Sequence, residues 1–348
     1  MQEQNEPTPL SKVGEFNLID KLTEKIKIYN KSTILGVGDD AAIINHNECH
    51  TLISTDMLVE GIHFDLLYTP LKHLGYKAVI TNLSDIYAMN AEPRQITVSI
   101  AASNRISVEA LEEIYEGINL ACECYKVDLV GGDTTSSLSG LIISVTVMGS
   151  AKEEKIVRRC GAQENDLICV SGDLGAAFAG LQLLEREKSI FNENQHIQPD
   201  FDGKDYVLER QLKPEARKDI IDFFEQEGIL PTSMIDISDG LSSELLHLAK
   251  NSKVGLLVYE DKIPIDLMTI TTMEEFNLNP LTAALNGGED YELLFTLPLS
   301  YHDKIKNAED IHIIGHITDK IEGCHLMPTG SGSLIELKAQ GWQSKMNE

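Results

Sequence analysis

Acidic residues stand at the ends of several short apolar runs in this chain of 348 residues. In "LGVGDDAAII" (residues 35–44), Asp39 and Asp40 follow two glycines, at a place where a phosphate-binding loop would carry a lysine. Apolar runs that end in acids bring carboxylates to the rim of a sheet, and carboxylate oxygens are ligands that suit Mg²⁺. The pattern therefore indicates a site for divalent cations. The other clusters are "STDMLVEGIHFD" (54–65), "NLSD" (82–85), "LVGGDTT" (129–135), "MIDISDG" (234–240) and "LNGGEDYELLF" (285–295).

Taken singly, each cluster also has a purely structural explanation. Asp39 and Asp40 are ordinary turn residues, and Asp239 stands where an N-cap would begin the helix that follows. Successive strand residues point to opposite faces, so at most one of Asp39 and Asp40 easily faces a shared site. Six clusters in one chain nevertheless favour the shared site over six unrelated turns and caps.

The glycines of the first cluster also fit the dinucleotide-binding pattern G-x-G-x-x-G/A, through Gly36, Gly38 and Ala41. That pattern requires a helix after the second glycine, whereas residues 41–56 indicate two strands joined by a polar turn. A P-loop is excluded because no Gly-Lys-Ser/Thr follows. A Rossmann dehydrogenase is therefore a distant alternative.

A few basic and aromatic residues are candidates for contacting a ligand that carries both charge and an aromatic ring. Arg158 and Arg159 lie in an irregular charged stretch, and an arginine aimed at a polyphosphate suits phosphoryl transfer. Trp342, the single tryptophan, either anchors the C-terminal region or stacks on an aromatic ligand. His63 alone is more typical of a partly buried structural histidine. No Ser-His-Asp or Cys-His pattern indicates a nucleophile.

Composition narrows the class of protein. A formal net charge of −26 disfavours binding to nucleic acid or to acidic membranes. The longest apolar stretch, residues 141–149, is too short to cross a bilayer, and the first residues do not form a signal peptide. Six cysteines without a C-x-x-C pair indicate reduced thiols rather than zinc ligands. We therefore expect a soluble cytoplasmic protein.

The elements that must position the acids follow from the apolar periodicity. Helices that cover mainly antiparallel sheets form an α+β fold. The chain is longer than one typical core supports, and residues 151–163 are charged and aperiodic, so we expect domains over 1–150 and 151–348. We expect helices over 14–29, 71–89, 107–125 and 214–228, strand-turn-helix units over 166–185 and 233–252, and strands over 41–45, 50–56, 95–102, 127–133, 140–149, 255–261, 291–298 and 311–318.

Together the motifs resemble bacterial thiamine-monophosphate kinase, from about residue 14 to residue 342. "STDxLVEGxHF" and "GGEDYEL" carry the resemblance most specifically, because "GDD" and "GGD" also fit relatives in the same superfamily. Those relatives are aminoimidazole ribonucleotide synthetase, selenophosphate synthetase and the hydrogenase-maturation protein that dehydrates a carbamoyl group. No cysteine lies within residues 1–48, which argues against a selenophosphate synthetase. The remaining matching motifs are "GEFNLI", "YKAVITNLSDIYAMNAEP", "RRCGA" and "IDISDGLSSEL".

The resemblance implies a two-domain α+β subunit that pairs through its N-terminal domain into a homodimer. The N-terminal domain would bind ATP and several Mg²⁺ ions near the interface, and the C-terminal domain would bind thiamine monophosphate. Asn90 replaces a glycine that is usual in the family, and asparagine tolerates the left-handed backbone of a turn. By position, the implied catalytic residues are Asp85, Asp133 and Arg159; the metal ligands Asp40, Ser54, Thr55, Asp56, Asp85, Asp133, Asp236 and Asp239; the ATP contacts Tyr115, Gly132, Asp133, Arg159 and Ser238; and the substrate contacts His63, Glu289 and Trp342.

The chemistry of the implied reaction agrees with these residue types. The γ-phosphoryl group of ATP would move onto a phosphate monoester, so two polyanions must meet and their charge must be neutralised. Mg²⁺ ions held by carboxylates, together with Arg159, would supply that neutralisation. The accepting oxygen is already ionised, so we expect direct in-line transfer to give thiamine diphosphate, without a phosphoenzyme. A metal-binding scaffold without activity would leave Arg159 and Trp342 unexplained.

Overall fold

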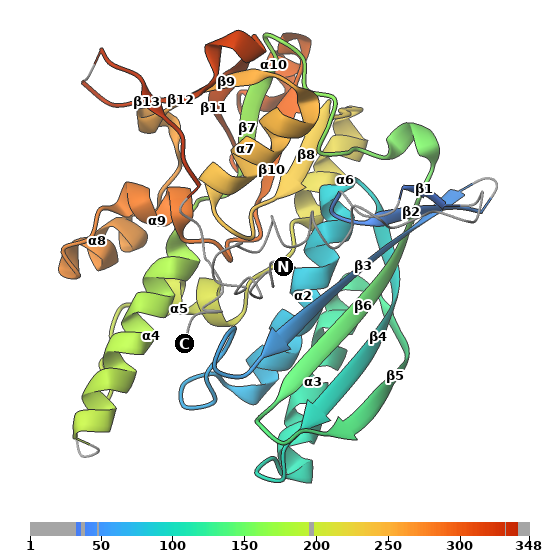
Figure 1. Cartoon of the computed structure of the whole chain (residues 1–348), viewed down its shortest axis with the longest axis vertical. Helices are drawn as coiled ribbons and strands as arrows, with labels where there is room; N and C mark the ends of the chain where they lie inside the picture. The colour runs from blue at the N-terminus through green and yellow to red at the C-terminus, as the bar shows by residue number, and fades with distance from the viewer. Residues whose placement is uncertain (1–32, 36–38, 47–48, 195–197, 331, 340–348) are drawn as a thin grey trace, which may run out of the picture.

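The computed structural model describes residues 33–35, 39–46, 49–194, 198–330 and 332–339. Two sheets, each with its own helices, form an N-terminal and a C-terminal half (Figure 1). The expected α+β fold is confirmed, whereas the helix expected over 14–29 lies outside the described residues. Within the described ranges, no helix combines the length and the apolar character that crossing a membrane requires.

The N-terminal half is built on a six-stranded sheet. Its elements are β1 (Thr33–Leu35), β2 (Ala42–His46), β3 (Cys49–Val59), α2 (Leu71–Ala88), β4 (Glu92–Ala102), α3 (Val108–Tyr125), β5 (Asp128–Ser136) and β6 (Ile142–Ala151). The strand order is β1-β2-β3-β6-β4-β5, and β4 and β5 form the one parallel pair of this sheet. The prediction of a mainly antiparallel sheet is therefore confirmed.

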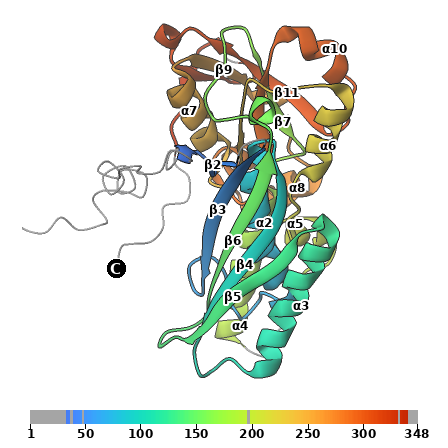
Figure 2. The ribbon, with the colours of Figure 1, turned by 90° about the vertical axis from the view of Figure 1, so that its right-hand side faces the viewer.

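This sheet has one covered face and one uncovered face. Ile96, Val98 and Ile100 of β4 are buried against the helices, and the residues between them are more exposed, as the period of two in a strand requires. Figure 2 shows α2 and α3 on the same side of the sheet. No element of the described chain covers the other face, which includes Thr55 and Met57 of β3.

The C-terminal half is built on a seven-stranded sheet. Its strands are β7 (Leu167–Ser171), β8 (Ser233–Asp236), β9 (Gly255–Tyr259), β10 (Leu293–Leu297), β11 (Ile311–Thr318), β12 (Cys324–Met327) and β13 (Ile335–Glu336). Its helices are α4 (Ala176–Glu193), α5 (Asp205–Leu212), α6 (Lys218–Glu227), α7 (Leu241–Ser252), α8 (Leu267–Glu275), α9 (Pro280–Asn286) and α10 (His302–Ile305). The order β13-β12-β9-β11-β7-β10-β8 is antiparallel except between β9 and β12.

Helix α2 holds the two halves together. It is buried along most of its length, against β3 and β6 on one side and near β8 on the other. The Ser84 hydroxyl donates a 2.7 Å hydrogen bond to Asp236 at the end of β8, and the Tyr76 hydroxyl donates a 2.5 Å bond to Glu215. Residues of α2 therefore lie between the two sheets.

Two local expectations had different outcomes. Asn90 adopts the left-handed backbone expected of it, with φ of 54°, and its side chain donates to the Lys155 carbonyl at 2.8 Å. The helix expected over 214–228 begins only at Lys218, so its predicted start was wrong. The Tyr125 hydroxyl explains the delay, because it bonds Glu215 Oε2 at 2.7 Å and accepts from the Ala216 N–H at 3.0 Å.

Candidate active site

A cavity of about 510 Å³ lies between the two halves. Its N-terminal wall comes from residues 56–68 and α2, and its C-terminal wall comes from α4 and from residues 236–239 and 287–291. Several predicted site residues line it: Asp56, His63, Asp85, Asp236, Ser238, Asp239 and Glu289. A second cavity, of about 670 Å³ between residues 261–266 and 302–313, contains none of them.

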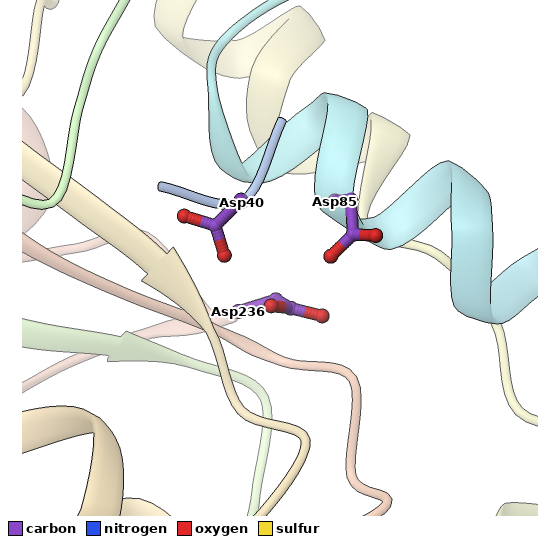
Figure 3. A group of neighbouring side chains, drawn as sticks. All are labelled: Asp40, Asp85 and Asp236. Carbon is purple, nitrogen blue, oxygen red and sulfur yellow. The ribbon is translucent and has the colours of Figure 1, made fainter. Parts of the chain in front are cut away.

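Three aspartates from separate segments converge beside the first cavity, and Figure 3 shows their carboxylates turned toward one another. Asp40 precedes β2, Asp85 lies in the last turn of α2 and Asp236 ends β8. One oxygen of each carboxylate lies within 4.8 Å of those of the other two. Three hard oxygen donors at this spacing suit a Mg²⁺ ion.

Burial makes Asp85 and Asp236 difficult to ionise. It raises the pKa of Asp85 well above its usual range, and Asp56, Asp236 and Asp40 raise it further. The pKa of Asp236 rises to about 8, first through burial and then through Asp40. Burial also raises the pKa of Asp56, although a hydrogen bond to Asp85 lowers it. Carboxylates that repel one another in this way favour a cation among them, so the charge and the donor atoms both fit Mg²⁺.

Hydroxyl groups orient two of the three carboxylates. Ser54 Oγ donates to Asp85 Oδ2 at 2.5 Å, from the same face of β3 as Asp56. Ser84 Oγ donates to Asp236 Oδ2 at 2.7 Å. The sequence prediction missed Ser84, although the Ser-Asp pair at 84–85 resembles the pair at 238–239 and was a signal for it.

Arg159 lies against the first cluster in the sequence. Its Nε and Nη2 donate to the two carboxylate oxygens of Asp40 at 2.9 and 2.8 Å, and its N–H donates to Asp39 Oδ1 at 3.3 Å. Burial alone would lower the pKa of Arg159, but Asp40 raises it. The pKa of Asp39 rises to about 7 through burial and the charge of Asp40. Asp40 therefore belongs to the carboxylate group, whereas Asp39 contacts the backbone of Arg159.

Ser238 and Asp239 lie on the cavity wall before α7. The N-cap position of α7 is occupied by Gly240, with φ of 113°, so no side chain caps this helix. The Asp239 N–H donates to Glu244 Oε1 at 3.0 Å. The N-cap interpretation of Asp239 is therefore wrong.

His63 and Glu289 face the cavity from opposite halves. His63 Nδ1 accepts a 3.0 Å hydrogen bond from the Val59 N–H. Glu289 has a left-handed backbone with φ of 59°, as has Tyr291 with φ of 53°. Glu289 Oε2 lies 3.1 Å from the Nζ of Lys77, a residue that the sequence prediction missed. The one signal for Lys77 is a lysine within the apolar segment "GYKAVITNL".

Thr55 and Asp133 do not reach the carboxylate group within this chain. Thr55 alternates with Ser54 and Asp56 along β3 and therefore points to the uncovered face of the sheet. The cross-strand register places Asp133 on that same face. Asp133 is three strands away from β3 in the sheet order, which is roughly 14 Å at the usual strand spacing.

The remaining predicted residues are also separate from the carboxylate group. Gly132 precedes Asp133 on β5, and Tyr115 on α3 packs against the core of the N-terminal half. Trp342 lies outside the described residues.

Comparison with known proteins gives consistent matches over nearly the whole chain. A family model described as "AIR synthase related protein, N-terminal domain" matches residues 38–151. The thiamine-monophosphate kinase of Bacillus subtilis (strain 168) is 32% identical over 95% of this chain and 99% of that relative. The solved thiamine monophosphate kinase from Aquifex aeolicus is 31% identical, with a TM-score of 0.76 over 94% of this chain and 100% of that one. The structure described as AaThiL complexed with AMPPCP and TMP is 31% identical, with a TM-score of 0.82 over 97% of this chain and 99% of that one.

Proposed function

The chain belongs to the thiamine-monophosphate kinase family, and from that membership we propose that it transfers the γ-phosphoryl group of ATP to thiamine monophosphate, forming thiamine diphosphate. The convergence of Asp40, Asp85 and Asp236 beside a cavity carries the proposal. A structural relative that holds AMPPCP, an ATP analogue, together with TMP supports both substrates.

Several Mg²⁺ ions would be held at the carboxylate group, by Asp40, Asp85 and Asp236 and by Ser54, Asp56 and Asp239 around them. Bound there, Mg²⁺ would neutralise charge on the phosphates. Arg159 contributes a fixed positive charge to the same end of the site and can bind a phosphate oxygen. The hydroxyls of Ser54 and Ser84 hold two carboxylates in place, which limits their rearrangement during the reaction.

A homodimer that pairs through the uncovered face of the N-terminal sheet would complete the ATP site. Thr55 and Asp133 share that face but are three strands apart, so one subunit does not bring both to one ion. A second copy placed across the face can supply the missing ligand. In this arrangement residues 1–150 bind ATP and Mg²⁺ and form the interface, with Tyr115 and Gly132 near the nucleotide.

Residues 151–348 would provide most of the acceptor site, through Glu289 and Trp342, with His63 contributed by the N-terminal half. Ser238 would contact ATP. The accepting phosphate oxygen is ionised near neutral pH and needs no base. The site therefore has to align two substrates and neutralise charge, and in-line transfer without a phosphoenzyme suits that task.

The proposed function is tested by incubating the purified protein with ATP, Mg²⁺ and thiamine monophosphate and separating the products by chromatography. Thiamine diphosphate is expected, and the Asp85→Asn variant should form almost none while remaining folded. In-line transfer predicts inversion at phosphorus when the γ-phosphorus of ATP is made chiral. Failure to form thiamine diphosphate, with turnover on a formylglycinamidine nucleotide or on selenide instead, would overturn the assignment.

A further inference from the structure

Lys77 is a buried cation behind the part of the cavity wall that Gln211 and Glu289 form. Its side chain lies in the middle of α2 and its residue is 5% exposed. Nζ donates to Glu289 Oε2 at 3.1 Å and to the Gln211 carbonyl at 2.9 Å. That carbonyl belongs to the last turn of α5, where carbonyls lack partners within the helix and a cation is favoured. Lys77 therefore ties α2 to α5 and to the loop that carries Glu289.

Gln211 holds the same carboxylate from the other side. Its Nε2 donates to Glu289 Oε2 at 2.9 Å. A carboxylate only accepts hydrogen bonds, so the amide turns its NH₂ group toward Glu289 and its Oε1 away. This Oε1 is buried and has no hydrogen-bond partner among the described residues. Both bonds to Glu289 fall on Oε2, which leaves Oε1 of Glu289 as an acceptor at one end of the cavity, whereas Oε1 of Gln211 is buried.

The distance between this end and the carboxylate group follows from α2. Lys77, Thr81 and Asp85 are spaced at i, i+4 and i+8, so they share one face of the helix, and Thr81 and Asp85 line the cavity. Eight residues at 1.5 Å each give a separation of roughly 12 Å. Leu58 and Phe64 supply apolar surface to the cavity wall. A ligand that reaches both ends is therefore elongated, with an anionic group at one end and hydrogen-bond donors at the other.

We propose that Lys77 and Gln211 are positioning residues which fix Glu289, and that this end of the cavity selects an aromatic ring that carries a primary amino group. The inference rests on the proposed function, because thiamine monophosphate has a phosphate at one end and an aminopyrimidine ring at the other. An N–H of the amino group would donate to Oε1 of Glu289, the oxygen that neither Lys77 nor Gln211 contacts. Lys77 and Gln211 act through Glu289 and do not contact the reacting phosphoryl group.

Steady-state kinetics of three single variants test the positioning role. Lys77→Met should raise the KM for thiamine monophosphate about tenfold or more, because it removes a charged hydrogen bond, and should leave the KM for ATP unchanged. Lys72→Met is the matched control, because Lys72 lies on the same helix but is 47% exposed in its side chain and pairs with Glu116. Gln211→Met removes the hydrogen bond from Gln211 to Glu289 and provides a second test of the positioning role if Lys77→Met does not fold. Adding Lys77→Met to Glu289→Gln should change the KM little further, because the first residue acts through the second.

The substrate analogue in which an oxo group replaces the amino group tests selectivity directly. The wild type should prefer thiamine monophosphate over this analogue by roughly a hundredfold or more in kcat/KM, and Lys77→Met should lose most of that preference. If the wild type forms no thiamine diphosphate at all, the proposed function fails. If it does form thiamine diphosphate, but Lys77→Met and Gln211→Met keep the full preference and an unchanged KM, then the positioning role is refuted.

Discussion

Replacing Asp236 by asparagine should stabilise the metal-free protein while abolishing its activity. Asp236 is 4% exposed, and its pKa rises from 3.8 to about 8, first through burial and then through Asp40. At pH 7 the unfolded chain therefore carries an ionised Asp236, whereas the folded chain must take up a proton. The three pH units between the unfolded pKa and pH 7 correspond to roughly 4 kcal/mol of lost stability, at 1.36 kcal/mol per unit. Asparagine is neutral in both states, and its carbonyl can still accept from Ser84.

Calorimetric unfolding at pH 7 measures this effect. In EDTA, the melting temperature of Asp236→Asn should exceed that of the wild type by several degrees, and the exposed Asp202→Asn control should not change it. Mg²⁺ should raise the melting temperature of the wild type far more than that of Asp236→Asn, because a ligand that binds only the folded state stabilises it. A variant that melts below the wild type in EDTA, or that keeps near wild-type turnover, would refute the reasoning.

Three further predictions address pH, the arginine and the uncovered face. The metal-free wild type should lose stability as the pH rises from about 4 to about 8, because folded Asp236 retains a proton that the unfolded chain releases. A melting temperature in EDTA that increases with pH over this range would contradict the prediction. Arg159→Lys should lower kcat about a hundredfold, because lysine does not reproduce the two hydrogen bonds of the arginine to Asp40. An activity within twofold of the wild type would show that this contact is not needed for the reaction. Met148→Glu should give a folded monomer in analytical ultracentrifugation, because Met148 shares the uncovered face with Thr55, and an unchanged dimer would place the interface elsewhere.

Local patterns were sufficient to predict the elements that carry the carboxylate group. The apolar run that begins after Asp40, the apolar run that ends in Asp236 and the long helix that contains Asp85 follow from residue periodicity alone. The recurrence of acids at element ends then identified the type of site. These features are encoded within about 20 residues of sequence each.

Contacts between distant segments escaped prediction because no local pattern encodes them. Lys77 bonds the carbonyl of Gln211, a residue 134 positions later in the chain. The separation of Thr55 from Asp133 depends on a strand order in which β6 and β4 lie between β3 and β5. The late start of α6 likewise depends on the hydroxyl of Tyr125, which belongs to the other half.

The left-handed backbones of Glu289 and Tyr291 have a consequence for protein engineering. Side chains in this conformation cost about 1–2 kcal/mol each relative to the right-handed region, and glycine would avoid that cost. Glycine at position 289 would nevertheless leave the buried Lys77 ammonium without its carboxylate, and glycine at position 291 would leave a cavity where Tyr291 packs, so neither substitution stabilises the fold. Positions 289 and 291 should therefore stay fixed in any attempt to make this chain thermostable, because the strain of their backbones is smaller than the loss of the contacts that their side chains make.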